Sequence, residues 1–257
     1  MKIFVCVKHV PDTANSITVQ GEKGYDDSDV KFIINPYDEF ALEEAISIVE
    51  EKGGEVVVIT VAKEGATSTI RSALAMGADR AIHVKTDSQF LESSLTAKAL
   101  KAVMDEDGLP DMIFTGKGSV DTESFQTPYR LAYALGMPFV NDVSGLSFEG
   151  DKVTAIAEIG AGAKQVVEMN LPSIIGAAKG LNEPRYPKVM QVMKAKKKEI
   201  KEIALSALGI DAGDGKTVME NLKLAPERSG AKLIEGSVDD QVTELIRILK
   251  DSEKVLA

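Results

Sequence analysis

The sequence predicts an α/β fold in which a mostly parallel, Rossmann-like sheet is flanked by helices. Short runs of apolar, β-forming residues alternate with segments whose apolar residues recur every three or four positions. The helical segments run to about ten residues and the loops are short, which is typical of right-handed βαβ crossovers onto a parallel sheet. The strand runs are residues 2–8, 56–61, 80–84 and 112–114.

Three helices are predicted between these strands. Apolar residues from Phe40 to Val49 have helical spacing, so a helix begins near Asp38 and ends at the glycine pair 53–54. The second helix, residues 66–76, is rich in Ala, and the third spans residues 95–104. Before the first helix, residues 14–34 alternate weakly around a polar stretch, which predicts a hairpin or a similar excursion.

An antiparallel meander is predicted after residue 136. Residues 143–148, 152–159 and 163–169 are strand-forming runs joined by tight polar turns that contain glycine. Residues 173–178 are one more apolar segment. The antiparallel strands therefore follow the parallel part of the sheet in the chain.

The C-terminal part differs from the rest of the chain. Apolar residues become sparse after Ile200, until residues 242–249 predict a final amphipathic helix. Residues 211–232 carry little that is able to form a core, so we expect an extended arm that needs another surface, such as a partner chain. The predicted division is therefore an α/β domain at residues 1–190 and a C-terminal arm with a helix at residues 191–257.

Composition excludes several classes of function. The chain has 257 residues and a formal net charge of -10, so binding to a nucleic-acid backbone is not expected. One cysteine, Cys6, permits no internal disulfide, and His9 and His83 with it do not supply an ordinary zinc cluster, so no metal site is predicted. The apolar run at residues 1–10 is too short for a signal peptide or a membrane span. We therefore expect a cytoplasmic location.

The loop at residues 116–127 is the main candidate site. It is rich in Gly, Ser, Thr and Asp, and it joins the strand at residues 112–114 to a helix that covers residues 129–136. Such a junction presents free backbone N–H groups and a positive helix end, which suit a phosphate. The loop carries neither a Walker motif nor a G-x-G-x-x-G motif, and an ordinary capped turn is the alternative. Ligands of parallel sheets bind at the carboxyl ends of strands, so the loops after Val7, Val61 and Phe114 should share that edge.

Several collinear motifs resemble the beta subunit of the electron transfer flavoprotein. The resemblance covers nearly the whole chain, and its strength lies in the order and spacing of the motifs. They are Val7-Lys8 with Pro11-Asp12, Asn35-Pro36-Tyr37-Asp38 before Ala41-Leu42-Glu43-Glu44-Ala45, Thr69-Ile70-Arg71 with residues 73–80, Gly116-Lys117, and Leu181-Asn182-Glu183-Pro184-Arg185-Tyr186 with residues 193–198.

The resemblance implies a heterodimer with an adenine-nucleotide-binding α/β domain. In that family an alpha subunit holds the redox FAD, and the beta subunit holds AMP or, in bifurcating members, a second FAD. The nucleotide site would then comprise Cys6, Asn35, Pro36, Tyr37, Asp38, Val61, Gly116, Lys117, Gly118, Ser119, Val120, Asp121, Thr122, Glu123, Ser124, Phe125, Gln126 and Thr127. Backbone amides near residues 124–127, with the hydroxyls of Ser124 and Thr127, would hold the phosphate. Asp121 would order the turn or meet a ribose hydroxyl.

We expect AMP in this chain, with FAD as the alternative. Bifurcating members tend to carry a loop like Asp-Gly-Asp-Thr-Ala-Gln-Val-Gly-Pro, whereas residues 121–128 read Asp-Thr-Glu-Ser-Phe-Gln-Thr-Pro. Phe125 occupies space that a larger cofactor needs, and the Gln126-Thr127 pair resembles AMP-binding members. Pro128 echoes the bifurcating pattern, and so does not separate the two cases. Tyr37 matches an aromatic residue that approaches the flavin of the alpha subunit.

The resemblance also implies a partner-docking loop. It comprises Leu181, Asn182, Glu183, Pro184, Arg185 and Tyr186, with Leu181 as the anchor that enters a pocket on a dehydrogenase. The implied partners are acyl-CoA-type or other flavin dehydrogenases and, through peripheral contact, a membrane quinone-reducing oxidoreductase. From the residues alone this stretch is an ordinary turn, and the lysines at 194–198 are a solvated face.

The predicted function is therefore electron transfer without bond chemistry in this chain. It would hold a structural nucleotide, brace the flavin domain of its partner and dock electron donors. Two other hypotheses stay open: a bifurcating component in which a second FAD accepts hydride from NADH, and a free-standing adenine-nucleotide-binding protein of the universal-stress type. The meander, the loop at residues 181–186 and the arm are features that the last class would not need.

Overall fold

The computed structural model describes residues 1–226, 230–231 and 233–256, and it divides the chain into two compact units. The first unit is Met1–Leu222 and the second is Lys223–Ala257. The predicted arm at residues 211–232 spans the junction, and its residues 227–229 and 232 lie outside the described part. The predicted domain boundary at residues 190 and 191 stays a prediction.

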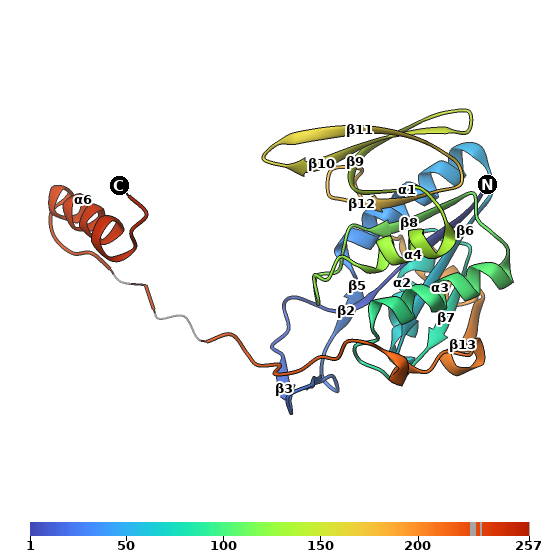
Figure 1. The fold of residues 1–257 in the computed structure, drawn as a ribbon, viewed down its shortest axis with the longest axis horizontal. Helices are drawn as coiled ribbons and strands as arrows, with labels where there is room; N and C mark the ends of the chain where they lie inside the picture. The colour runs from blue at the N-terminus through green and yellow to red at the C-terminus, as the bar shows by residue number, and fades with distance from the viewer. Residues whose placement is uncertain (227–229, 232, 257) are drawn as a thin grey trace. The chain divides into compact units, whose positions relative to one another are not determined.

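A nine-stranded sheet, counted over the described residues, forms the centre of the first unit (Figure 1). Its spatial order is β11-β10-β9-β12-β8-β1-β6-β7-β13. The last seven strands in this order, which begin with β9 and end with β13, are each parallel to their neighbours among these seven. The strands are β1 (Lys2–Cys6), β6 (Glu55–Ala62), β7 (Arg80–Lys85), β8 (Met112–Gly116), β9 (Phe139–Glu149), β10 (Lys152–Gly160), β11 (Ala163–Asn170), β12 (Ser173–Ala177) and β13 (Ile200–Ala204). The predicted mostly parallel α/β fold is confirmed.

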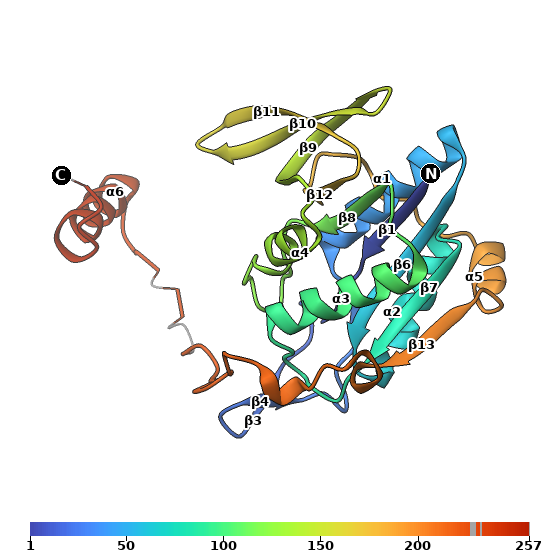
Figure 2. The ribbon, with the colours of Figure 1, turned by 45° about the vertical axis from the view of Figure 1, so that its right-hand side comes forward.

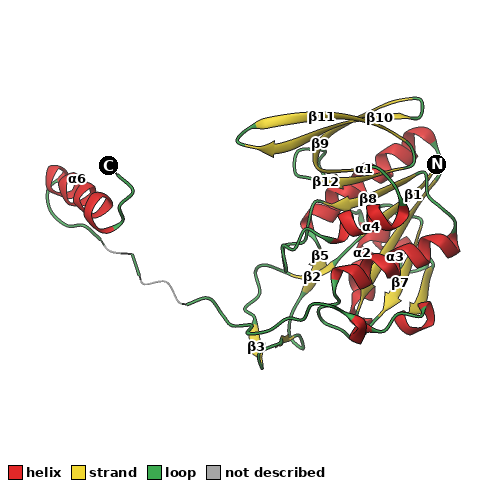
Figure 3. Cartoon of the chain, in the orientation of Figure 1, coloured by secondary structure: helices red, strands yellow, loops and turns green. Residues whose placement is uncertain are grey.

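Helices cover both faces of the sheet (Figure 3). α1, α2 and α5 pack on one face, while α3 and α4 pack on the other. Successive side chains of a strand point to opposite faces, so Ile3 and Val5 of β1 join the first core and Phe4 joins the second. The helices are α1 (Pro36–Lys52), α2 (Thr67–Met76), α3 (Ser93–Asp107), α4 (Thr127–Leu135) and α5 (Val189–Ala195), with 3-10 turns at Glu64–Ala66, Leu205–Leu208 and Ala212–Asp214.

Successive strands of the chain are added first on one side of β1 and then on its other side. After β1 it adds β6 and then β7 on one side, and β8 then pairs with the other side of β1. The carboxyl ends of β1 and β8 therefore diverge into loops that lead to opposite faces. Such a topological switch point is where ligands bind in open parallel sheets.

The antiparallel meander is continuous with the parallel sheet (Figure 2). β9 begins at Phe139, four residues before the predicted start, and it pairs with β12 in parallel and with β10 in antiparallel fashion. A register shift at Ile156 and Ala157 and a positive φ of 58° at Asp142 mark the bulge where β9 turns away. The predicted meander strands are all present, and their register with β12 was not visible in the sequence.

Two small ribbons leave the sheet between β1 and α1. β2 (His9–Pro11) pairs with β5 (Phe32–Ile34), and β3 (Thr18–Gln20) forms a hairpin with β4 (Gly24–Asp26). The predicted excursion is therefore two nested antiparallel pairs. α1 begins at Pro36, two residues before the predicted start, because the fixed φ of proline suits the first turn of a helix.

β13 and α5 are a strand and a helix that the sequence analysis did not predict. Ile200 and Ile203 of β13 pack on the two cores from the sheet edge beside β7. Lys198, which the sequence placed in a solvated basic run, donates from Nζ to Ala78 O at 2.5 Å and to Leu74 O at 3.1 Å at the end of α2. A strand of five residues at a sheet edge, in which only Ile200, Ile203 and Ala204 are apolar, gives too weak a periodic signal to predict.

The second unit contains α6 (Val238–Arg247), which continues into a π-helical turn at Ile248–Ser252. Ser237 caps α6 in a reciprocal capping box with Asp240. Val242, Leu245 and Ile246 lie on its surface and are exposed. The predicted final helix is confirmed, with its start four residues earlier. Over the described residues, no helix has the length and apolarity that crossing a membrane requires.

Candidate functional site

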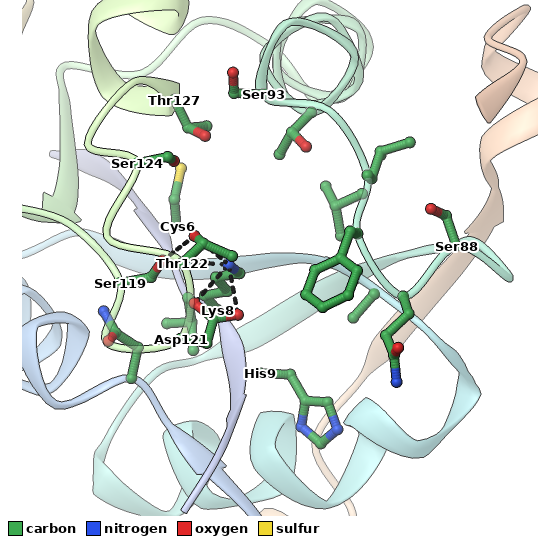
Figure 4. Close-up of a pocket in the computed structure, with 18 of the residues that line it drawn as sticks. Cys6, Lys8, His9, Ser88, Ser93, Ser119, Asp121, Thr122, Ser124 and Thr127 are labelled. Carbon is green, nitrogen blue, oxygen red and sulfur yellow. Dashed lines mark hydrogen bonds and ion pairs between the residues drawn. The ribbon is translucent and has the colours of Figure 1, made fainter. Parts of the chain in front are cut away.

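A cavity of about 1110 Å³ opens at the switch point, where β1, β6 and β8 end (Figure 4). This volume is slightly above the usual range for small-molecule and cofactor sites, roughly 300–1,000 Å³. Two walls face each other across it. We name them the loop wall, formed by Lys8 and residues 116–127, and the ring wall, formed by His9, Phe32, Gln89 and Phe90.

Most of the predicted nucleotide residues line this cavity. They are Cys6, Asn35, Asp38, Val61, Gly116, Gly118, Ser119, Asp121, Thr122, Ser124, Phe125, Gln126 and Thr127. The predicted residues that are not part of its lining are Pro36, Tyr37, Lys117, Val120 and Glu123. The structure therefore brings together residues from four separate stretches of the chain.

Asp38 and Asn35 fix the loop wall from behind. The buried Asp38 carboxylate accepts the backbone N–H of Lys8 at 2.7 Å through Oδ2 and that of Gly116 at 2.9 Å through Oδ1. Asn35 Nδ2 donates to Asp38 Oδ1 and to Gly118 O, and its Oδ1 accepts the Val120 N–H. These contacts join β1, β8 and α1 at one point.

The buried carboxyl group of Asp38 has a raised pKa, and it lies so close to Gly116 that no side chain fits there. Desolvation raises the pKa of Asp38 to about 7, against the lowering effect of the N–H groups that it accepts. A Cβ on Gly116 would lie 2.3 Å from Asp38 Oδ1, so only glycine permits this contact. The two residues are therefore structurally dependent on each other, and Asp38 is a structural anchor.

The loop wall leads directly into α4 without a side-chain cap. Glu123 and Phe125 have φ values of 45° and 52°, which bend the chain so that it enters α4 at Thr127. In the described structure no side chain accepts the first free N–H groups of this helix. Uncapped N–H groups at a helix start are available to an anion, and the helix dipole favours one there. The exposed side chain of Glu123 lies outside the cavity lining.

Phe125 packs on the backbone of Gly118. A Cβ on Gly118 would lie 2.3 Å from Cδ1 of the Phe125 ring. The ring is 40% exposed and lines the cavity on the loop-wall side. It therefore occupies space beside the loop that a smaller residue would leave open.

Lys8 is a cavity residue that the site prediction did not include. Its Nζ lies 2.8 Å from Asp121 Oδ1, 3.2 Å from Ser119 Oγ and 3.4 Å from Thr122 Oγ1 (Figure 4). The ammonium group thus ties the loop to the end of β1 and places a positive charge in the wall. Its position immediately after Val7, at the predicted ligand edge, was a signal in the sequence.

The ring wall was also absent from the site prediction. His9 stacks on Phe32 with centroids 4.1 Å apart and planes 13° apart, and its Nδ1 lies 2.7 Å from Thr69 Oγ1. Burial lowers the pKa of His9 to about 4, so the ring is neutral near pH 7. Gln89 exchanges two hydrogen bonds with the backbone of Tyr25, which closes the same side of the cavity.

Two groups on the cavity lining bear on ligand chemistry. Burial, followed by the charge of Asp38, raises the pKa of the Cys6 thiol, which therefore stays protonated and is a poor nucleophile. Thr115 is 5% exposed, and its Oγ1 has no hydrogen-bond partner among the described residues. Buried hydroxyl groups are normally paired, so Thr115 has hydrogen-bonding capacity for a ligand.

Tyr37 and Lys117 form a separate cluster beside the cavity. Lys117 Nζ lies 3.0 Å from Asp142 Oδ1 and 5.3 Å from the centroid of the Tyr37 ring. Asn141 Nδ2 donates to Lys117 O at 3.1 Å. This cluster connects the end of β8 to the bulge of β9, and its two predicted residues lie outside the cavity lining that contains Cys6 and Val61.

The loop at residues 181–186 lies on α1 and is well ordered by contacts. Leu181 is partly buried and packs on the core, whereas Tyr186 is 95% exposed. Arg185 pairs with Glu43 and Glu50 of α1. The large exposed apolar side chain of this loop is therefore that of Tyr186.

Fold and cavity together define a class: an open, mostly parallel α/β protein with a nucleotide-sized cavity at its switch point. Residues 23–208 match the family model described as the electron transfer flavoprotein domain. The chain is 34% identical over 260 residues to the electron transfer flavoprotein subunit beta of Bacillus subtilis, with all of both chains covered. The protein of that name from Syntrophomonas wolfei is 36% identical over 257 residues, with 99% of this chain and 98% of that chain covered. The one from Dictyostelium discoideum is 37% identical over 247 residues, with 95% and 97% covered.

The chain therefore belongs to the electron transfer flavoprotein family. It aligns along its full length with beta subunits, as the motifs of the sequence predicted. Membership implies a role in electron transfer within a flavin-containing complex.

Proposed function

We propose that this chain is the beta subunit of a heterodimeric electron transfer flavoprotein and binds AMP in the cavity at the switch point. The alpha subunit would hold the FAD, which accepts and donates the electrons. This chain would hold a structural nucleotide and dock electron donors, with no bond chemistry of its own. The observation that carries the proposal is the cavity between the loop wall and the ring wall.

The residues of the cavity fit an adenosine monophosphate. The uncapped start of α4 and the ammonium of Lys8 suit a phosphate group, whereas the unpartnered Thr115 hydroxyl suits a polar atom of the sugar or base. The ring wall is suited to an aromatic base, since Phe32, Phe90 and the neutral His9 provide flat, uncharged rings. AMP has a phosphate for the start of α4 and Lys8, a sugar for the Thr115 hydroxyl and an aromatic base for the ring wall.

The charge of the cavity favours a ligand with little negative charge. The lining contains the cations Lys8, Lys31 and Lys63 and the acids Asp27, Asp38, Glu92 and Asp121. Each of these lysines has an acidic partner, since Lys31, Lys63 and Lys8 pair with Asp12, Asp27 and Asp121 respectively, and Lys8 is the one bonded to the loop. A single phosphate is therefore better matched than a triphosphate.

A second FAD in place of AMP is the other candidate. The volume of the cavity favours it, because about 1110 Å³ exceeds the need of a mononucleotide. The Phe125 ring on Gly118 favours AMP, because it fills space beside the phosphate loop. A complex with FAD in both subunits would be a bifurcating component.

Cofactor stoichiometry decides between the two. The heterodimer would be purified with its alpha subunit, its nucleotides released with acid, and the products separated and counted. We expect one FAD and one AMP per heterodimer. Two FAD without AMP would establish the bifurcating alternative, and one FAD without any other nucleotide would refute nucleotide binding by this chain.

The proposal includes docking of flavin dehydrogenases at residues 181–186. Exposed apolar groups beside charged ones are typical of an interface centre with a polar rim, and Tyr186 and the neighbouring Val189 are 95% and 81% exposed. Leu181 would need to emerge from its partly buried position, or to act as a support for the loop. The rate of electron transfer from an acyl-CoA dehydrogenase to Leu181→Ala and Tyr186→Ala heterodimers would rank the two residues.

A further inference from the structure

Arg185 has both of its acidic partners on one helix. Its Nε donates to Glu43 Oε1 and Oε2 at 3.1 and 2.9 Å, and Nη2 donates to Glu43 Oε1 at 2.9 Å. Nη1 and Nη2 also donate to the two carboxylate oxygens of Glu50, at 2.6 and 3.0 Å. Each edge of the planar guanidinium therefore meets a carboxylate, which is the strongest geometry for this side chain.

Glu43 binds the backbone of the loop as well as its side chain. Glu43 Oε2 accepts the backbone N–H of Arg185 at 3.0 Å, and the Glu43 side chain is only 10% exposed. A buried carboxylate without its cation is strongly unfavourable, so the loop and the helix depend on each other at this point. Glu50, which is 60% exposed, contributes less because water screens it.

A second contact fixes the other end of the loop. Asn182 Nδ2 donates to Phe40 O at 3.0 Å and to Glu44 Oε2 at 2.8 Å. Leu181 packs on the core next to it. The loop is thus attached to α1 at both ends, while Tyr186, the residue after Arg185, remains exposed.

We propose that Glu43 and Arg185 form a clamp that positions the loop at residues 181–186 for its partner, so that Arg185 is a positioning residue and does not contact the partner. This inference rests on the proposed docking function. It adds Glu43, a residue of α1 that the docking prediction did not include, and it makes Arg185, which that prediction did include, an internal support of the loop. The guanidinium is already saturated by carboxylates, so a partner would have to break the clamp to use it.

Amide hydrogen exchange of the heterodimer tests the clamp without any partner. In Glu43→Gln the carboxamide no longer pairs ionically with Arg185, although Glu50 still does. We expect the amides of Leu181 and Arg185, the hydrogen-bonded amides of the loop, to exchange about tenfold faster, while the amides of β1 and β8 keep their wild-type rates. Arg185→Lys, which keeps the charge but loses the planar fork, should show the same change to a smaller degree.

Arg80 provides a matched control. It is held by Glu55 at the start of β6 and Asp107 at the end of α3, also through both edges of the guanidinium. Glu55→Gln and Arg80→Lys remove the same kind of interaction away from the loop. In these two variants, exchange at residues 181–186 should match the wild type, which separates a clamp from a general loss of stability.

Steady-state electron transfer from an acyl-CoA dehydrogenase that reduces the wild-type heterodimer gives the functional measurement. A misplaced loop weakens encounter, so Glu43→Gln should raise the KM for the heterodimer about fivefold and leave kcat within about twofold. The control variants should leave both constants unchanged. Bound nucleotide, measured after acid release, should be the same in all variants.

The possible results separate the clamp from the docking function. Unchanged exchange at residues 181–186 in Glu43→Gln would overturn the clamp. Faster exchange with an unchanged KM would show that the clamp orders the loop but does not serve the partner, which overturns the positioning role. If Tyr186→Ala and Leu181→Ala also left KM unchanged in that case, the docking function itself would have failed.

Discussion

The two walls of the cavity are built in different ways. The loop wall is one continuous segment, residues 116–127, to which β1 adds Lys8 and α1 adds its anchor. The ring wall collects His9 and Phe32 from the two strands of one ribbon, and Gln89 and Phe90 from a loop that is distant in the chain. The loop wall offers N–H groups and a cation, whereas the ring wall offers flat apolar rings. The difference shows that one wall of a site can be recognised from a single stretch of sequence, whereas the other exists only after distant segments have packed together.

The walls also respond to pH in opposite directions. The pKa of Asp38, behind the loop wall, is raised from 3.8 to about 7, so its contribution to stability falls as pH rises from about 4 to 7. The pKa of His9, in the ring wall, is lowered from 6.5 to about 4, so its contribution falls as pH drops from about 6.5 to 4. Substitution of Asp38 or of His9 should therefore remove the pH dependence of stability that arises from that wall.

The largest effect is expected at the loop wall, from Asp38→Ala. This change leaves the N–H groups of Lys8 and Gly116 buried without an acceptor, at a cost of about 3 kcal/mol in the free energy of unfolding. The loop should also lose its position, so the purified heterodimer should contain little AMP. Urea unfolding and nucleotide content measure the two effects. Asp38→Asn keeps one acceptor oxygen, so its free energy of unfolding should lie between those of Asp38→Ala and the wild type. Equal stability of all three proteins would refute the role of Asp38 as an anchor.

A smaller effect, with a distinct pH profile, is expected at the ring wall from His9→Gln. In the wild type the unfolded chain takes up a proton on His9 below pH 6.5, whereas the folded chain resists it down to about pH 4. The wild type should therefore lose about 2 kcal/mol between pH 6.5 and 4 that the variant keeps, after allowance for partial solvent screening. Urea unfolding at several pH values provides the measurement. If stability changed with pH in the same way in the variant and the wild type, His9 would have the same pKa in the folded and the unfolded chain.

The smallest effect is expected at the contact between Gly118 and Phe125. Gly118→Ala places a methyl group against the Phe125 ring, which is half-exposed and able to swing away, so we expect a loss of about 1 kcal/mol. The double variant with Phe125→Ala should recover that loss, since the clash is then absent. Additive losses in thermal unfolding would contradict the contact. If Phe125 limits the size of the cofactor, Phe125→Ala alone should raise the FAD to AMP ratio of the purified heterodimer.

The sequence was informative wherever the signal lay within one element. Residues 56–61 and 112–114 predicted buried strands, and residues 116–127 predicted a strand-to-helix loop, because apolar periodicity and turn chemistry are local properties. Lys8 was not among the predicted site residues, because those residues were taken from the family resemblance. β13 was not predicted either, since its apolar residues are too few to form a pattern of their own.

Which surfaces meet was decided by tertiary structure alone. His9 and Phe32 stack because β2 pairs with β5, and Arg185 reaches Glu43 because the loop after β12 crosses α1; no local pattern encodes either pairing. The sequence by itself determined the mostly parallel sheet, most of its helices and strands, the strand-to-helix loop at residues 116–127 and the family. The tertiary structure decided the ring wall, the anchor at Asp38 and the clamp at Arg185, because each arises from side chains that only the packed chain brings within hydrogen-bonding or van der Waals distance.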